Sequence, residues 1–125
     1  MSWRCPNASA VGAYMLRHWQ LELYAHATIT ARRGAATPGV LWSVTPDCEQ
    51  RLDRFEGYPV YYQKRSWRQD GHEFFFYVMT PDHCQGNPMH SYVADMRDSY
   101  RIWNLPDTDL PTSQQDHLGP VRDLI

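Results

Sequence analysis

The fold is decided by the stretch Gly39–Tyr62, which reads G-V-L-W-S-V-T-P-D-C-E-Q-R-L-D-R-F-E-G-Y-P-V-Y-Y. Its first residues alternate as in a half-buried strand, and Thr45 and Pro46 then supply a helix N-cap and a first helical residue. Gly57 is the expected end of that helix, and Pro59 prevents it from restarting. The stretch therefore predicts a strand, a capped helix, a tight turn and a second strand.

The predicted helix ends on a carboxylate, Glu56. The negative end of the helix dipole lies there, so we expect the pKa of this side chain to be raised, which suits a proton acceptor. Cys48, Leu52 and Phe55 form the apolar stripe that would face the core. On these grounds alone, a solvated glutamate at a helix end is the simpler explanation.

The bulk composition narrows the class of protein. A chain of 125 residues with 42% hydrophobic residues fits one folded domain, and a net charge of −2 gives no reason to expect nucleic acid or an anionic membrane as a partner. No apolar run approaches the roughly 18 residues of a membrane helix. The three scattered cysteines predict reduced thiols, with Cys48 buried, and a cytoplasmic protein.

The remaining pattern predicts an α+β protein with a small curved sheet or barrel. The expected elements are a strand over Leu21–Ile29, a loop over Ala31–Pro38, two strands over Val60–Arg68 and Glu73–Met79 around an Asp70-Gly71 turn, and a helix over Met89–Trp103. Residues 107–125 are expected to form an extended or disordered arm.

The sequence resembles the γ-glutamylcyclotransferase-like family. The likeness is carried by G-V-L-W-S-V-T-P and L-D-R-F-E-G-Y-P-V-Y-Y within Gly39–Tyr62, by R-C-P-N-A at residues 4–8 and by P-x-x-x-Y at residues 88–92. It implies one domain over residues 1–106, a small mixed β-barrel flanked by helices. It also implies release of 5-oxoproline from a small γ-glutamyl amine or peptide, with no metal and no cofactor.

The same resemblance assigns roles to individual residues. Glu56 matches the glutamate of the L-D-x-x-E-G motif, which is the catalytic acid/base of the family. Tyr62 and Tyr92, with Tyr61 beside them, are candidates for substrate-binding walls or hydrogen-bond donors. A place in the aromatic core is the competing explanation for each tyrosine.

The sequence also departs from the family pattern. The family has a Tyr-Gly-Ser-Asn loop after its first strand, and Tyr-Gly-Ser occurs nowhere here. Met1 stands where the family has an internal methionine, so we expect the first strand and its loop to be missing. An unpaired strand edge would favour self-association, which leaves a homodimer open. A non-catalytic small-molecule-binding or regulatory protein is therefore the alternative function.

Other polar residues give weaker signals. The spacing of His72, His83, Cys84 and His90 matches no standard zinc pattern. Cys84 has no recognisable partner for a nucleophile and is expected to be a free thiol. Arg32-Arg33 is expected to be a solvated basic pair.

Overall fold

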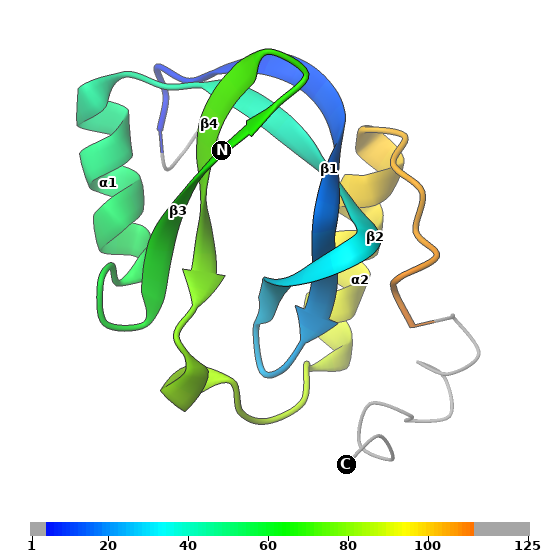
Figure 1. Ribbon diagram of the computed structural model, residues 1–125. Helices are drawn as coiled ribbons and strands as arrows, with labels where there is room; N and C mark the ends of the chain where they lie inside the picture. The colour runs from blue at the N-terminus through cyan, green and yellow to red at the C-terminus, as the bar shows by residue number, and fades with distance from the viewer. Residues whose placement is uncertain (1–4, 112–125) are drawn as a thin grey trace.

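Residues 5–111 are described by a computed structural model, and they form an α+β arrangement, as the sequence predicts (Figure 1). In chain order the elements are β1 (Ser9–Leu23), β2 (Ala27–Ser43), α1 (Pro46–Glu56), β3 (Tyr62–Gln69), β4 (His72–Met79), the 3-10 helix η1 (Pro81–His83) and α2 (His90–Ile102).

β1 and β2 form one long antiparallel hairpin, which corrects the strand predicted over Leu21–Ile29. Leu23 pairs with Ala27, so the predicted strand is split by a turn into two arms. The turn contains no glycine, proline, asparagine or aspartate to mark it in the sequence. A distant segment holds it instead, because the Ala25 N–H donates to the Gln85 carbonyl oxygen at 2.9 Å.

The loop predicted over Ala31–Pro38 is also wrong, because these residues belong to β2. The register shifts here, between Arg17 and Trp19 of β1. His18 and Gly34 both have positive φ, and the Gly34 N–H donates to His18 Nδ1 at 3.2 Å. The polar and glycine signals therefore mark an irregularity within the hairpin rather than a break between elements.

α1 has the boundaries that its capping residues predict. The Thr45 hydroxyl accepts a hydrogen bond from the Cys48 N–H at 3.1 Å, and Gly57 ends the helix in the left-handed conformation, with φ 68°. Cys48 and Leu52 are buried, as expected. Phe55 is 48% exposed, so the expected apolar stripe does not extend to it.

The second hairpin, β3–β4, is confirmed with boundaries moved by one or two residues. Asp70 and Gly71 connect its strands with φ values of 53° and 79°. Positive φ at both central residues is the requirement of a type I′ turn, for which Asp-Gly is a favoured pair. Two adjacent residues of the sequence were therefore enough to predict this turn.

α2 confirms the helix predicted over Met89–Trp103, and it buries Val93 and Tyr100. The chain then turns at Asn104, which has a φ of 53°. Leu110 is buried, so the predicted C-terminal arm begins with a packed segment; residues 112–125 lie outside the described part of the chain.

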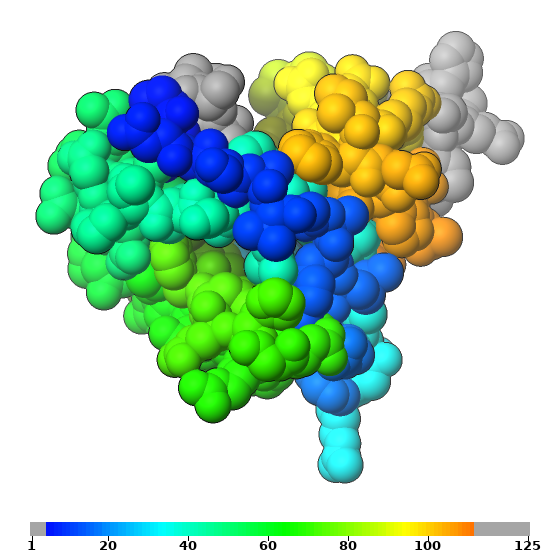
Figure 2. All heavy atoms as spheres, turned by 90° about the horizontal axis from the view of Figure 1, so that it is seen from above, coloured from blue at the N-terminus to red at the C-terminus, as the bar shows by residue number. Residues whose placement is uncertain are grey.

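α1 and α2 lie on opposite sides of the strands (Figures 1 and 2). Within residues 5–111 the strands pair as two separate sheets, β1 with β2 and β3 with β4. The closed barrel expected from the sequence is therefore not confirmed.

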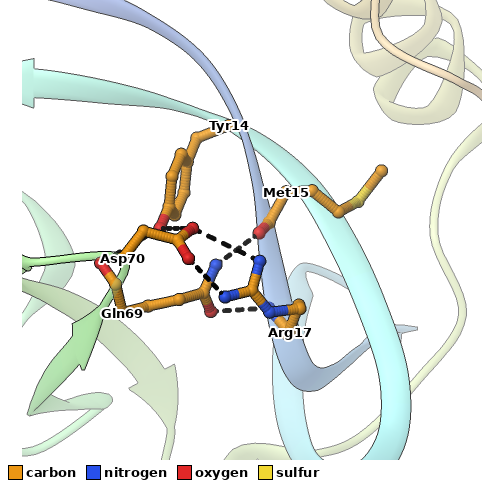
Figure 3. Close-up of polar contacts among 5 residues, drawn as sticks. All are labelled: Tyr14, Met15, Arg17, Gln69 and Asp70. Atoms are coloured by element: carbon orange, nitrogen blue, oxygen red, sulfur yellow. Dashed lines mark hydrogen bonds and ion pairs between the residues drawn. The ribbon is translucent and has the colours of Figure 1, made fainter.

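Side chains join the two hairpins where strand pairing does not. The Gln69 amide accepts from the Arg17 N–H at 3.0 Å and donates to the Met15 carbonyl oxygen at 2.8 Å, as a neighbouring strand would (Figure 3). Near the other end of the hairpin, the Met79 N–H donates to Thr28 Oγ1 at 2.8 Å. These contacts hold the two hairpins together.

The cysteines correct another expectation. Cys5 and Cys48 are joined by a disulfide that links the turn before β1 to α1, and only Cys84 among the three is free. Their separation of 43 residues explains why spacing alone did not pair them. The expected cytoplasmic location rested on reduced thiols, and it stays a prediction.

Candidate active site

A cleft of about 980 Å³ opens between the end of α1, the start of α2 and the two hairpins. Hydroxyl-bearing aromatic side chains dominate its wall, together with two histidines and one carboxylate. The lining residues are His26, Ala27, Arg54, Phe55, Glu56, Gly57, Tyr61, Tyr62, Tyr77, Met79, His83 and Tyr92. The three residues singled out in the sequence, Glu56, Tyr62 and Tyr92, thus lie on one cleft although they come from three different elements.

Glu56 is held at the cleft by the end of α1. It is the last residue of the helix, and Gly57 turns the chain away immediately after it. A β-carbon on Gly57 would lie 2.6 Å from Cδ2 of Tyr61, so this position requires glycine for space as well as for its positive φ. The carboxylate therefore stands at a helix end beside a turn in which any replacement of Gly57 would be strained.

Tyr62 and Tyr92 meet at the backbone of Ala27. The Tyr62 hydroxyl donates to the Ala27 carbonyl oxygen at 3.0 Å, whereas the Tyr92 oxygen accepts from the Ala27 N–H at 2.9 Å. The hydroxyl hydrogen of Tyr62 is therefore engaged in a hydrogen bond. Within residues 5–111 the Tyr92 hydroxyl donates to no protein acceptor. Tyr92 can therefore offer a hydrogen bond to a ligand in the cleft.

The electrostatics of the cleft keep Tyr62 protonated. Burial, followed by the neighbouring Tyr92 and the charge of Glu56, raises the pKa of Tyr62 to about 12. Tyr62 is therefore not a proton acceptor at neutral pH. Glu56 is the carboxylate that lines the cleft, so it is the candidate for that role.

The second carboxylate of the L-D-R-F-E-G motif, Asp53, is already engaged. It accepts a hydrogen bond from the Tyr77 hydroxyl at 2.5 Å and pairs with Lys64 Nζ at 2.8 Å. Burial alone would raise the pKa of Asp53, but the hydrogen bonds from Lys64 and Tyr77 hold it below its usual value. Asp53 therefore stays ionised, which makes it a poor proton carrier.

Sequence reasoning missed several residues of the cleft. Tyr77 lies in the apolar run of β4, and His26 falls within the strand predicted over Leu21–Ile29, where the structure has a turn. His83 was weighed only as a metal ligand; it packs against the Tyr61 ring at 4.6 Å and bonds Thr80 Oγ1 at 2.7 Å. A hydroxyl inside an otherwise apolar strand was the one signal that could have pointed to Tyr77.

Two kinds of feature are absent from the described part of the chain. Between residues 5 and 111, no cluster of three or more His, Cys, Asp or Glu side chains is placed to hold a metal ion. In the same residues no helix has the length and apolar character needed to cross a membrane.

Comparison with known proteins identifies a sequence family that this chain matches. The sequence model of the family described as gamma-glutamyl cyclotransferase, AIG2-like, matches residues 2–100, which confirms the resemblance noted in the sequence. No curated protein sequence matches the chain.

Two solved structures share the fold. An uncharacterized protein from Homo sapiens has a TM-score of 0.55 at 17% identity, over 97% of this chain and 89% of that one. A structure named gamma-glutamyl cyclotransferase has a TM-score of 0.53 at 16% identity, over 98% of this chain and 89% of that one. At such identities the likeness concerns the fold alone.

Proposed function

We propose that this chain, which belongs to the gamma-glutamyl cyclotransferase, AIG2-like family, releases 5-oxoproline from a small γ-glutamyl amine or peptide, with Glu56 as general acid/base. The observation that carries the proposal is the convergence of Glu56, Tyr62 and Tyr92 on one cleft. Its volume of about 980 Å³ leaves room for the glutamyl group and for the amine attached to it.

The reaction needs no nucleophile from the protein, because the substrate carries its own. The α-amino nitrogen attacks the γ-carbonyl carbon, a ring C–N bond forms, and the bond to the departing amine breaks. The α-ammonium group sheds two protons in all, and both end on the amine, which leaves as its ammonium ion. Glu56 accepts a proton from the attacking nitrogen and passes it to the leaving nitrogen. The cleft has the further task of holding the substrate in a folded, attack-ready conformation.

Negative charge develops on the γ-carbonyl oxygen during this attack and requires a donor. The family draws contacts to the glutamyl group from a Tyr-Gly-Ser loop that this sequence does not contain. We assign a donor role to Tyr92, because the Ala27 N–H orients its oxygen while its own hydrogen is available. Tyr62, fixed by the Ala27 carbonyl, forms the adjoining wall.

A non-catalytic binding protein on the same fold is the second candidate. The observation that favours it is the missing Tyr-Gly-Ser sequence. Such a protein would keep the cleft and bind a γ-glutamyl compound without converting it.

The test measures three products at once. Purified protein is incubated with γ-glutamyl amines and γ-glutamyl dipeptides, and 5-oxoproline, free amine and glutamate are quantified by mass spectrometry. Cyclotransfer predicts 5-oxoproline and amine in equal amounts. Glutamate in place of 5-oxoproline would identify a hydrolase and contradict the proposal, whereas binding without either product would support the second candidate.

Tyr92→Phe tests the donor role within the same assay. Removing one oxyanion donor lowers kcat by about 10²–10³-fold in well-studied enzymes, and we expect a loss that approaches the lower end of that range. Tyr100→Phe is the matched control, because Tyr100 is a buried tyrosine of the same helix that does not line the cleft. Equal activity of the two variants would remove Tyr92 from the catalytic machinery.

A further inference from the structure

We propose that Asp53, together with Lys64 and Tyr77, forms a positioning unit that holds Glu56 at the cleft. The inference rests on the proposed function, since it concerns how the acid/base of that reaction is held. It gives the aspartate of the L-D-R-F-E-G motif a role of its own, that of a positioning residue which does not touch the substrate.

The contacts of this unit run from α1 to both strands of the second hairpin. Lys64 of β3 places its Nζ 2.8 Å from Asp53 Oδ1 and 2.6 Å from Glu49 Oε2. Tyr77 of β4 donates its hydroxyl to the same Asp53 oxygen at 2.5 Å. One carboxylate on α1 therefore fixes the helix to two neighbouring strands at once.

Helix geometry transmits this anchoring to Glu56. Residues three apart lie on the same face of a helix, so Asp53 and Glu56 share a face in consecutive turns. The Asp53 carbonyl oxygen also accepts the Tyr58 N–H at 2.9 Å, in the turn that ends the helix. The side chain of Asp53 thus sets the rotation of the last helical turn, and its backbone closes that turn directly after Glu56.

The surroundings make the unit rigid. The Lys64 side chain is only 19% exposed, and its Nζ lies over the rings of Tyr58 and Phe75 at 5.0 and 5.1 Å from their centres. Tyr77 lines the cleft beside Glu56, and both residues also line a smaller cavity of about 420 Å³. Tyr77 therefore belongs to the wall next to the acid/base and to the anchor of its helix.

The experiment combines Asp53→Asn and Tyr77→Phe with Glu56→Gln. Each single variant keeps the shape of its side chain, so folding is expected to survive. Because small misplacements of catalytic groups have large effects, we expect kcat to fall about 10-fold to 100-fold, with KM changed by no more than about twofold. Added to Glu56→Gln, neither change should lower the residual rate further, because both act through Glu56.

The matched control is Asp70→Asn at the other end of the same hairpin. Asp70 also accepts from a tyrosine hydroxyl and pairs with a cation, but it is not among the residues that line the cleft. Its substitution should leave kcat unchanged. A merely structural role for Asp53 would instead lower the residual rate of the Glu56→Gln protein as well.

Amide hydrogen exchange supplies a readout that needs no turnover. In Asp53→Asn and Tyr77→Phe, exchange at the Gly57 and Tyr58 amides should accelerate about 10-fold or more, while amides of the β1–β2 hairpin stay unchanged. If the wild-type protein forms no 5-oxoproline, the proposed function fails and this exchange result alone decides the positioning role. Unchanged exchange at both amides, or an active enzyme with full kcat in both variants, would overturn the inference.

Discussion

The two ends of the β3–β4 hairpin use the same chemistry in different surroundings. At the strand ends, the near cluster joins Asp53 to a tyrosine hydroxyl and to Lys64. At the turn, the far cluster joins Asp70 to the Tyr14 hydroxyl at 2.8 Å and to Arg17 at 2.7 Å (Figure 3). The side chains of the ion pair are 19% and 25% exposed in the near cluster, against 51% and 48% in the far cluster.

This contrast teaches that solvent access, rather than the identity of the partners, decides how much each cluster contributes to stability. An exposed ion pair gains little because water solvates both charges well when they are apart. A shielded pair leaves an unsatisfied group behind when one partner is removed, and that loss is large. The near cluster should therefore control the site, whereas the far cluster helps to hold β1 against the hairpin.

The largest expected effect comes from breaking the near cluster outright. Asp53→Ala leaves the Tyr77 hydroxyl without its acceptor and Lys64 with one carboxylate in place of two. We expect a loss of about 1–3 kcal/mol in the free energy of unfolding, measured by urea denaturation. Asp70→Ala should shift the midpoint by much less, and equal shifts would refute the role given to solvent access.

Alkaline pH should also reduce the stability that the near cluster contributes. Burial, then the hydrogen bond to Asp53, raises the pKa of Tyr77 well above its ordinary value. The unfolded chain therefore loses this proton near pH 10, at about the ordinary tyrosine pKa, while the folded protein keeps it. The contribution of Tyr77 to the free energy of unfolding is therefore fully present below that pH and falls as the pH rises above it.

Tyr77→Phe isolates this contribution. Urea midpoints measured at about pH 9, 10 and 11 should decline less steeply in this variant than in the wild-type protein. Lys64, whose pKa is also raised in the folded protein by its carboxylate partners against the effect of burial, still contributes to the remaining decline. Identical slopes in the two proteins would show that the Tyr77 hydroxyl is not coupled to folding.

The smallest effect is expected in acid, at the far cluster. Hydrogen bonds from Arg17 and Tyr14 lower the pKa of Asp70 to about 2. Its contribution to stability is present above the unfolded value of about 3.9 and is lost as the pH falls towards 2. In Asp70→Asn this part of the acid decline should disappear, and an unaltered decline would show that the exposed pair contributes nothing measurable.

The sequence predicted those elements whose signals are local. Thr45 and Gly57 define α1 through capping, and Asp70-Gly71 defines the β3–β4 turn, each within a few residues. The β1–β2 turn was missed because Gln85, far along the chain, holds it. The Cys5–Cys48 disulfide depends on the packing of distant segments in the same way, so spacing could not reveal it.

The residues of the candidate site likewise fall into those that the sequence could predict and those that depend on the packing of distant segments. Glu56 could be placed from its helix end, and the family resemblance supplied Tyr62 and Tyr92. The link from Asp53 to Tyr77 could not be predicted, because it depends on which strand faces α1 after the hairpins pack. That same packing brings Ala27 between the two tyrosine hydroxyls, a contact that no local pattern encodes.

The most direct test of the account compares wild-type protein with Glu56→Gln in the 5-oxoproline assay. This substitution removes proton acceptance with almost no change of shape, so the fold and the binding of substrate should be preserved, as checked by thermal melting and by calorimetric titration. We expect wild-type turnover and a loss of about 10²–10⁴-fold in the variant, the usual contribution of a general acid/base. Turnover by Glu56→Gln close to the wild-type rate would contradict the central claim.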